Sequence, residues 1–320
     1  MTKYREIKGT LIQNVSADPP ASFEGQVWYN TTSNALKIDK GALVGAWATG
    51  GALNTGRAKL GGAGATNTAA LAFGGGPYLA ETESYNGTNW TEVNDLNSAR
   101  EKLVGVGTST AAIAVGGRPN THGAKTENWN GTNWTEVNDL NSLRNYMGGC
   151  GISTAALVFG GNATPVLPGT SVVTESWNGT NWTELNDMNT GRSGLAGAGT
   201  QTAGIGFGGY TPGDTNQALA ESWNGTNWTE VNDLNTARRF LGGAGSTNTA
   251  ALAFGGYGPT GQTELYNGTN WTELADLSTA RFRLAGAGTI PSALAIGGVG
   301  SPTATEEWST TGGIETITSS

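Results

Sequence analysis

Carboxylates recur at fixed positions along the chain and are the first residues whose spacing could do chemistry. Five copies of the string NGTNW are each followed by Glu two residues after the Trp and by Asp five residues after it. The pairs are Glu92 and Asp95, Glu136 and Asp139, Glu184 and Asp187, Glu230 and Asp233, and Glu273 and Asp276. A ring of such carboxylates could bind cations such as calcium. We favour a structural role, because Glu suits the solvent side of an alternating strand and Asn-Asp-Leu-Asn is ordinary turn chemistry. We therefore expect neither a metal site nor a cofactor.

Candidate nucleophiles and bases are scarce. The chain has one cysteine, Cys150, and one histidine, His122, so it can form no internal disulfide and no His-based metal cage. Cys150 lies in a Gly-rich segment and is expected to be a small core residue. His122 lies in the loop sequence RPNTHGA, where nothing nearby completes a catalytic triad. The sequence predicts no catalytic residue and a protein that is not an enzyme.

Composition restricts the fold and the partners. The 320 residues include 52 glycines and only 13% charged residues, which disfavours long helices and favours an all-β repeat fold. The net charge of −8 argues against nucleic acid as a partner. No stretch reaches the length of a membrane span, and the polar start MTKYREIKGT lacks the apolar core of a secretory signal. We expect no membrane association.

A repeat of 43 to 48 residues organises most of the chain. Its first marker is a Trp, which ends each NGTNW string and has a degenerate sixth copy in GAWATGGALNTGR. The six are Trp47, Trp90, Trp134, Trp182, Trp228 and Trp271. Ten residues after each Trp comes an Arg, namely Arg57, Arg100, Arg144, Arg192, Arg238 and Arg281. An apolar run ending in Gly-Gly and then an acid two residues before an aromatic complete each unit.

Each unit is expected to contain four short antiparallel strands. The first is Gly- and Ala-rich (LGGAG), the second is apolar (TAALAFGG), the third carries TESY or TESW, and the fourth is NWTEV. The Asn-Gly between the third and fourth strands favours a tight hairpin turn. Arg, Gly-Gly, aromatic and Trp in this order resemble the kelch repeat over residues 47–308. The resemblance implies a six-bladed β-propeller with each first strand at the central channel.

The repeated Trp and Arg residues are interpreted as structural. Trp suits a large buried contact between blades, and the Arg residues are expected to pair with carbonyl groups or with the repeated Glu. No NGTNW follows the last aromatic, Trp308. We therefore expect the N-terminal strand around Trp47 to close the ring by completing the last blade. The alternative is that Gly312 to Thr318 supplies the closing strand.

The segment between the second and third strands differs between units. From the second glycine to the repeated Glu it measures 8, 10, 14, 12, 8 and 8 residues. In a propeller these loops emerge on one face, and variation confined to one face is typical of a binding site. The candidate binding residues in them are Tyr78, Arg118, His122, Tyr210 and Tyr257. Unselected loop drift is the alternative.

The first residues stand apart from the repeats. We divide the chain into an attachment segment or β-hairpin at 1–42 and a propeller at 43–320. Within the first part, the stretch from Asp18 to Ile38 resembles a short β module of tail-fibre and other structural proteins of marine bacteriophages. That resemblance implies docking to other virion proteins. An extra hairpin, with QVWYN and ALKI as strands around TTSN, is compatible with it.

These observations together predict a virion protein located at the particle surface or tail. The N-terminal segment would dock to the particle, and the loop face would recognise a host surface glycan or protein without covalent chemistry. Two alternatives remain: a bacterial kelch scaffold for protein–protein interaction, and a sialidase-like propeller glycoside hydrolase. In the second, SYNGTNW is placed like the Asp-box turn but lacks its Asp. The sequence leaves the oligomeric state open.

Overall fold

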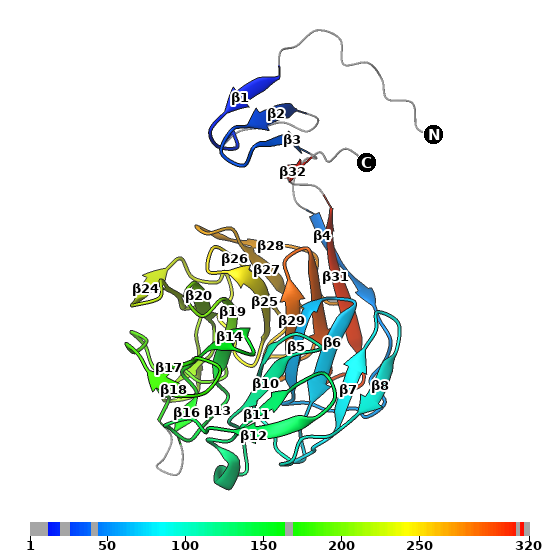
Figure 1. The fold of residues 1–320 in the computed structure, drawn as a ribbon, viewed down its shortest axis with the longest axis vertical. Coiled ribbons are helices and arrows are strands. Elements are labelled where there is room, and N and C mark those ends of the chain that lie inside the picture. The colour runs from blue at the N-terminus through cyan, green and yellow to red at the C-terminus, as the bar shows by residue number, and fades with distance from the viewer. Residues whose placement is uncertain (1–11, 20–25, 40–43, 164–168, 312–313, 317–320) are drawn as a thin grey trace. The chain divides into compact units, whose positions relative to one another are not determined.

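The structure is a computed structural model that describes residues 12–19, 26–39, 44–163, 169–311 and 314–316 (Figure 1). It separates into two compact units, one made of Met1–Gly45 with Thr310–Ser320 and the other of Ala46–Ser309. The described residues are strands and loops with a single 3-10 helix, η1 (Asn120–His122). Among them, no helix is long and apolar enough to cross a membrane.

The larger unit contains four-stranded sheets that follow one another along the chain. In sequence order, sheet 1 is β5 (Gly61–Thr66), β6 (Ala69–Phe73), β7 (Thr82–Tyr85) and β8 (Trp90–Val93); sheet 2 is β9 (Val104–Gly107), β10 (Ala112–Val115), β11 (Thr126–Trp129) and β12 (Trp134–Val137); sheet 3 is β14 (Gly148–Ile152), β15 (Ala155–Phe159), β17 (Thr174–Trp177) and β18 (Trp182–Glu184). Sheet 4 is β19 (Ala196–Gly199), β20 (Gly204–Phe207), β23 (Ala220–Trp223) and β24 (Trp228–Val231); sheet 5 is β25 (Gly242–Thr247), β26 (Ala250–Phe254), β27 (Thr263–Tyr266) and β28 (Trp271–Glu273). The last, sheet 6, is β29 (Ala285–Thr289), β30 (Ser292–Ile296) and β31 (Thr305–Thr311), with β4 (Val44–Thr49) beside β31.

Sheets 1 to 5 are antiparallel meanders, as the repeated sequence predicts, and sheet 6 is an antiparallel meander in its first three strands. In sheet 3, for example, Cys150 faces Leu157, Leu157 faces Ser176, and Trp177 faces Trp182 across successive strand pairs. The hairpin before each fourth strand is stabilised by its first Asn: the Asn178 side chain accepts hydrogen bonds from the backbone N–H groups of Thr180 and Asn181. An all-β chain built from repeated four-stranded antiparallel sheets is consistent with a β-propeller.

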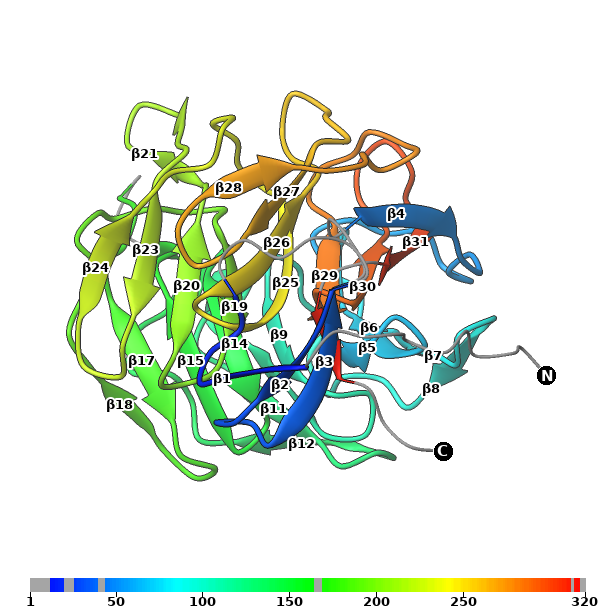
Figure 2. The same ribbon diagram turned by 90° about the horizontal axis from the view of Figure 1, so that it is seen from above.

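The first strands of the sheets contact one another in succession. β5 contacts β9, β9 contacts β14, and the series continues through β19, β25 and β29, which contacts β5. Figure 2 shows these strands nearest the middle of the unit and the fourth strands at its periphery. Glycine is required where the backbones meet, because a Cβ on Gly105 would lie 2.4 Å from the carbonyl oxygen of Gly62. This explains the Gly- and Ala-rich first strand.

The hydrophobic core lies between neighbouring sheets. One apolar cluster joins sheets 4 and 5 through Phe207, Ala253 and Trp271, and another joins sheets 6 and 1 through Ile296, Ala72 and Trp90. Ring contacts recur at these interfaces, with Trp134 4.8 Å from Phe73 and Trp228 4.7 Å from Phe159. Each second strand is therefore buried on both faces, which accounts for its continuous apolar sequence.

The repeated Trp also makes a polar contact with the preceding sheet. The indole N–H of Trp134 donates to the Thr82 hydroxyl at 3.0 Å, and that of Trp90 donates to Thr305 at 2.9 Å. Trp47 in β4 does the same with Thr263. In sheet 4 the Thr is replaced by Ala220, and Trp271 donates instead to the carbonyl of Asn232. The Thr at the start of the TESW motif therefore accepts a hydrogen bond from a repeated Trp, a role that composition did not reveal.

The smaller unit is a sheet with the order β1 (Gln13–Val15), β2 (Val27–Asn30), β3 (Ala35–Asp39) and β32 (Ile314–Thr316). β2 and β3 form the hairpin expected around TTSN, and the buried Trp28 donates its indole N–H to Asp18. Contacts group Thr310–Ser320 with the residues up to Gly45. The reason is that β32 pairs with β3. Parts of the alternative closing segment, at 312–313 and 317–318, lie outside the described residues.

Candidate functional site

Six equivalent residues, each two positions after a repeated Arg, surround one end of the first strands. Their φ angles are all positive, from 55° at Tyr146 and Phe240 to 63° at Gly194. The set is Lys59, Lys102, Tyr146, Gly194, Phe240 and Arg283, which we call the ring residues. Glycine adopts this left-handed conformation freely, whereas other residues do so at a cost of about 1–2 kcal/mol.

Backbone hydrogen bonds join the ring residues into a circle. Lys102 donates its N–H to the Lys59 carbonyl at 2.7 Å, and Tyr146 donates to the Lys102 carbonyl at 2.9 Å. The series continues through Gly194, Phe240 and Arg283, and it returns when Lys59 donates to the Arg283 carbonyl at 2.8 Å. The left-handed conformation directs each N–H along the circle. The backbone at this end is therefore fixed by its own hydrogen bonds, and the side chains are left to vary.

A cavity of about 120 Å³ lies within this circle and is lined by the ring residues and the starts of the first strands. We call it the mouth cavity. A second cavity of about 90 Å³ is lined by glycine, alanine, valine and cysteine residues of the first strands, from Gly62 to Gly288. Charged and aromatic side chains line the first cavity and are missing from the lining of the second. The charged and aromatic side chains around these two cavities are thus concentrated at the mouth end of the first strands.

Aromatic side chains form one side of the mouth cavity. The ring centroids of Tyr146 and Phe240 lie 4.7 Å apart. Gly194 makes this possible, because a Cβ there would lie 2.7 Å from the Phe240 ring. Next to them, the guanidinium of Arg239 lies 4.4 Å from the Tyr257 ring centroid and 5.1 Å from that of Tyr210. This is a layered cluster of aromatic rings and one guanidinium group.

Basic side chains form the other side. Lys59 lies 3.0 Å and Lys102 3.6 Å from carboxylate oxygens of Glu101, which is their shared partner. Arg283 lies 4.8 Å from the Phe240 ring centroid and has no ion pair among the described residues. Burial lowers the pKa of Lys102; Glu101 opposes this, and Arg118, Lys59 and Arg283 add to it. The lysine therefore sits among more positive than negative charge.

The hydroxyl group of Tyr146 is buried and has no hydrogen-bond partner in the structure. Burial raises the pKa of this phenol above its usual value, so it is a neutral O–H donor at neutral pH. A buried donor without a partner is unusual in a folded protein. Tyr146 is also one of the residues that line the mouth cavity.

The structure brings some of the predicted loop residues together and leaves others apart. Tyr210 and Tyr257 both contact Phe240 and Arg239 beside the mouth cavity. Arg118 precedes η1, and its positive charge acts to lower the pKa values of Lys102 and Tyr146. Tyr78 is 47% exposed, and His122 ends η1; no contact joins either to the cluster within the described residues.

The two longest variable loops approach each other at their bases. The side-chain amide of Asn162, in the short pair β13 (Arg144–Asn145) and β16 (Asn162–Ala163), donates to the Tyr210 hydroxyl at 2.9 Å. The second loop forms a small hairpin of β21 (Tyr210–Thr211) and β22 (Thr215–Asn216), and Asp214 at its turn pairs with Arg239. Residues 164–168 of the first loop lie outside the described residues, so the contact between the two loops is described only at their bases.

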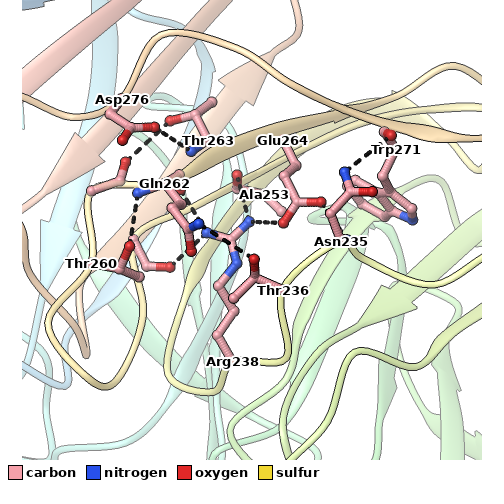
Figure 3. A network of polar contacts seen from close by, with 12 residues as sticks. Asn235, Thr236, Arg238, Ala253, Thr260, Gln262, Thr263, Glu264, Trp271 and Asp276 are labelled. Atoms are coloured by element: carbon pink, nitrogen blue, oxygen red, sulfur yellow. Dashed lines mark hydrogen bonds and ion pairs between the residues drawn. The ribbon is translucent and has the colours of Figure 1, made fainter.

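The repeated Arg residues lie away from the mouth cavity, buried within the sheets. Each pairs with the Glu of the third strand that follows, as Arg238 does with Glu264 at 2.8 Å (Figure 3). Arg238 also donates to the carbonyl of Gln262, and the second Glu264 oxygen accepts the backbone N–H of Asn235. Desolvation lowers the pKa of Arg100 to about 10, which leaves the group charged at neutral pH. Each Arg is thus held by its Glu and by backbone carbonyl groups, while its buried Nε has no hydrogen-bond partner among the described residues.

The other chemically suggestive residues have local contacts. In four of the five NGTNW units the Asp accepts a backbone N–H at the start of a third strand, as Asp95 does from Thr82 and Asp276 from Thr263. No group of three or more potential metal ligands occurs among the described residues. Burial raises the pKa of the Cys150 thiol to about 12, and its sulfur contacts the Thr200 carbonyl.

Sequence reasoning missed the ring residues, although a signal for them was present. The positions two residues after the repeated Arg hold Lys, Lys, Tyr, Gly, Phe and Arg, while the Arg itself never changes. This variation falls outside the variable loops, in which the sequence predicts the binding residues. No protein-family model matches the chain, and no curated protein matches its sequence.

Proposed function

We propose that the chain is a six-bladed kelch-like β-propeller, closed by the N-terminal strand β4, that recognises a ligand without catalysis. In this proposal it belongs to a bacteriophage virion, at the particle surface or tail. The N-terminal segment docks to other virion proteins, and the face with the mouth cavity meets a host surface glycan or protein.

Two contacts support closure by β4. Trp47 donates to Thr263 of sheet 5, as the other repeated Trp residues donate to the sheet before theirs. Its ring centroid lies 4.9 Å from Phe254, matching the Trp134–Phe73 contact between sheets 1 and 2. β4 thus occupies in sheet 6 the place that the fourth strand occupies in the other sheets.

The observation that carries the binding function is the identity of the ring residues. Gly194 shows that glycine fits the hydrogen-bonded circle, yet the other five positions hold Lys, Tyr, Phe or Arg in a left-handed conformation. Bulky residues at positive φ are uncommon and are concentrated at functional sites. Retaining them favours a role for their side chains in binding.

The pairing of the carboxylates near the mouth cavity favours a binding function over hydrolysis. A glycoside hydrolase requires a pair of Asp or Glu residues flanking the bond to be cleaved. Near the mouth cavity, Glu101 is held by Lys59 and Lys102, and Asp214 is held by Arg239. Both carboxylates are already ion-paired with basic side chains, so neither is free to act on a substrate.

Shortening the two long loops tests the recognition proposal. Asn162 to Val172 and Tyr210 to Leu219 would each be replaced by the five residues YGPTG, and binding of the full chain to a glycan array and to host cells would be measured. We expect an unchanged melting temperature, since loop length costs little free energy, and loss of binding. Retained binding, with loss on removing residues 1–42 instead, would contradict recognition by this face.

The virion assignment has its own test. Neighbouring genes for baseplate, portal or capsid proteins, and detection of the chain in purified particles by mass spectrometry, are the expected results. A gene set without virion components and absence from particles would favour the bacterial scaffold. Release of sugar from a bound glycan by the intact protein would favour the hydrolase.

A further inference from the structure

The charge near the mouth cavity is opposite to that of the protein as a whole. The chain carries a net charge of −8. Three basic side chains line the mouth cavity, however: Lys59, Lys102 and Arg283. Their ion-pair partner among the described residues is one carboxylate, Glu101, which Lys59 and Lys102 share. Surplus positive charge beside a partly enclosed cavity attracts anions and is costly to maintain without them.

The unused hydrogen-bonding capacity at the mouth consists of donors. The Tyr146 O–H has no hydrogen-bond partner among the described residues, and Tyr146 lines the cavity. No ion pair occupies Arg283 among the described residues. A ligand oxygen with negative charge would satisfy these donors, and hydrogen bonds of this kind are shorter and stronger than neutral ones.

The shape of the site favours a compact end group over an extended peptide. One way to bind an extended peptide is to add it as a strand to a sheet edge, where it uses free backbone N–H and C=O groups. Each ring residue has already committed its N–H and C=O to the circle. The cavity of about 120 Å³ is small beside ligand pockets of typical size. Tyr257, which is 43% exposed, offers an aromatic surface at the rim on which the apolar face of a sugar ring can pack.

We infer that the mouth cavity binds the acidic end residue of a saccharide, one that carries a carboxylate or a sulfate group. Arg283 and Lys102 contact the anionic group, the Tyr146 hydroxyl donates a hydrogen bond to one of its oxygens, and Tyr257 with Phe240 provides apolar contacts. This inference rests on the proposed recognition function and specifies its ligand.

The test compares acidic and neutral saccharides on the full chain. Oligosaccharides ending in glucuronic acid, N-acetylneuraminic acid or a sulfated galactose would be titrated beside neutral ones of equal length, by saturation-transfer NMR and calorimetry. We expect at least one acidic class to bind about tenfold or more tightly than its neutral match, as one charge-assisted hydrogen bond implies. Raising the ionic strength should weaken the binding.

Two variants test whether the ligand binds at the mouth cavity. Arg283→Gln should weaken acidic saccharide binding about tenfold, and Arg283→Lys should restore part of it. Tyr146→Phe should weaken binding without lowering the melting temperature, because its hydroxyl has no partner to lose. Lys125→Gln is the matched control: it removes one positive charge that pairs with Glu136, outside the mouth, and should leave binding unchanged.

The outcomes separate this inference from the proposed function. Binding of neutral and acidic saccharides with equal affinity, unaffected by Arg283→Gln and Tyr146→Phe but lost on loop shortening, would overturn the inference and leave recognition by the loop face intact. Binding of an acidic peptide in place of any saccharide, lost in the same two variants, would overturn the saccharide assignment. Binding of no saccharide together with host attachment that survives loop shortening would overturn both.

Discussion

At the scale of single residues, charged side chains in this chain fall into two classes. The six repeated Arg residues are buried to 1% exposure or less, and each faces a buried Glu. The basic residues that line the mouth cavity, Lys59, Lys102 and Arg283, are partly exposed and outnumber their acidic partner, Glu101. The first class was predictable, since Arg and Glu recur together in every repeat. The second was harder to predict, because the position two residues after the repeated Arg recurs in every unit but the amino acid at that position changes.

The first prediction concerns one buried pair, Arg144 and Glu175, whose charged atoms lie 2.7 Å apart. Arg144→Met should lower the free energy of unfolding by about 3–5 kcal/mol, because it leaves a buried carboxylate without its partner. Urea denaturation followed by tryptophan fluorescence measures this.

The control for that prediction is an exposed pair. Lys125→Met, which removes the ion pair with the half-exposed Glu136, should cost less than about 1 kcal/mol. Adding Glu175→Leu to Arg144→Met should recover part of the loss. Equal costs for the buried and exposed pairs would show that burial in the folded protein is incomplete.

The second prediction concerns Cys150. Burial raises the pKa of its thiol to about 12, so at pH 8 the reactive thiolate is a minute fraction of the native protein. Labelling by a disulfide reagent should therefore be slow in buffer and should follow the unfolding curve when urea is added. Rapid stoichiometric labelling of the native protein would place the thiol at the surface.

At the scale of strands, the sequence predicted the elements well and the loops less well. The four strands per repeat, the hairpin at Asn-Gly and the small residues of the first strand all follow from local patterns. The left-handed residues before each first strand do not, because Lys, Tyr, Phe and Arg give no local sign of positive φ. That conformation is imposed by hydrogen bonds to residues more than 40 positions away, such as those joining Lys59 to Lys102 and Lys102 to Tyr146.

The third prediction concerns the fourth strand of sheet 3. Trp182→Ala should cost about 3–5 kcal/mol, since the ring is 6% exposed and packs 5.3 Å from Trp177 within the core between sheets 2 and 3. Trp182→Phe keeps most of the apolar contact but loses the hydrogen bond from the indole N–H to the Thr126 hydroxyl. The lost hydrogen bond should add about 1 kcal/mol to the stability cost of the smaller ring.

Glu184→Ala on the same strand is the comparison for Trp182, since its side chain faces solvent. We expect it to change the unfolding midpoint very little. A loss below about 1 kcal/mol for Trp182→Ala would instead mark the repeated Trp as exposed, and hence as a candidate ligand platform.

At the scale of the whole molecule, the fourth prediction tests the proposed closure. Deleting residues 1–55 removes β4 and leaves β31 as an unpaired edge, so we expect aggregation or a large fall in the melting temperature. Deleting residues 1–42 retains β4 and should leave the melting of the repeat sheets close to that of the full chain.

Removing residues 312–320 tests the alternative. β32 pairs with β3 in the smaller unit, so its loss should affect that unit and spare the repeat sheets. If this truncation aggregated while the 1–55 deletion melted normally, the closing strand would belong to the C-terminus. Differential scanning calorimetry with light scattering distinguishes the two results.

The hydrogen-bonded circle at the mouth has a consequence for how such a protein can evolve. The circle is made of backbone groups alone, so a codon change at one of its five non-glycine places can alter the side chain without removing a hydrogen bond of the circle. The recognition surface can then be rewritten one substitution at a time while the repeats around it stay near-copies. The chain bears this signature: NGTNW is preserved letter for letter in five units, while the ring positions hold five different amino acids. If the ligand changes during evolution, single substitutions at the ring positions are the shortest way to change the binding surface.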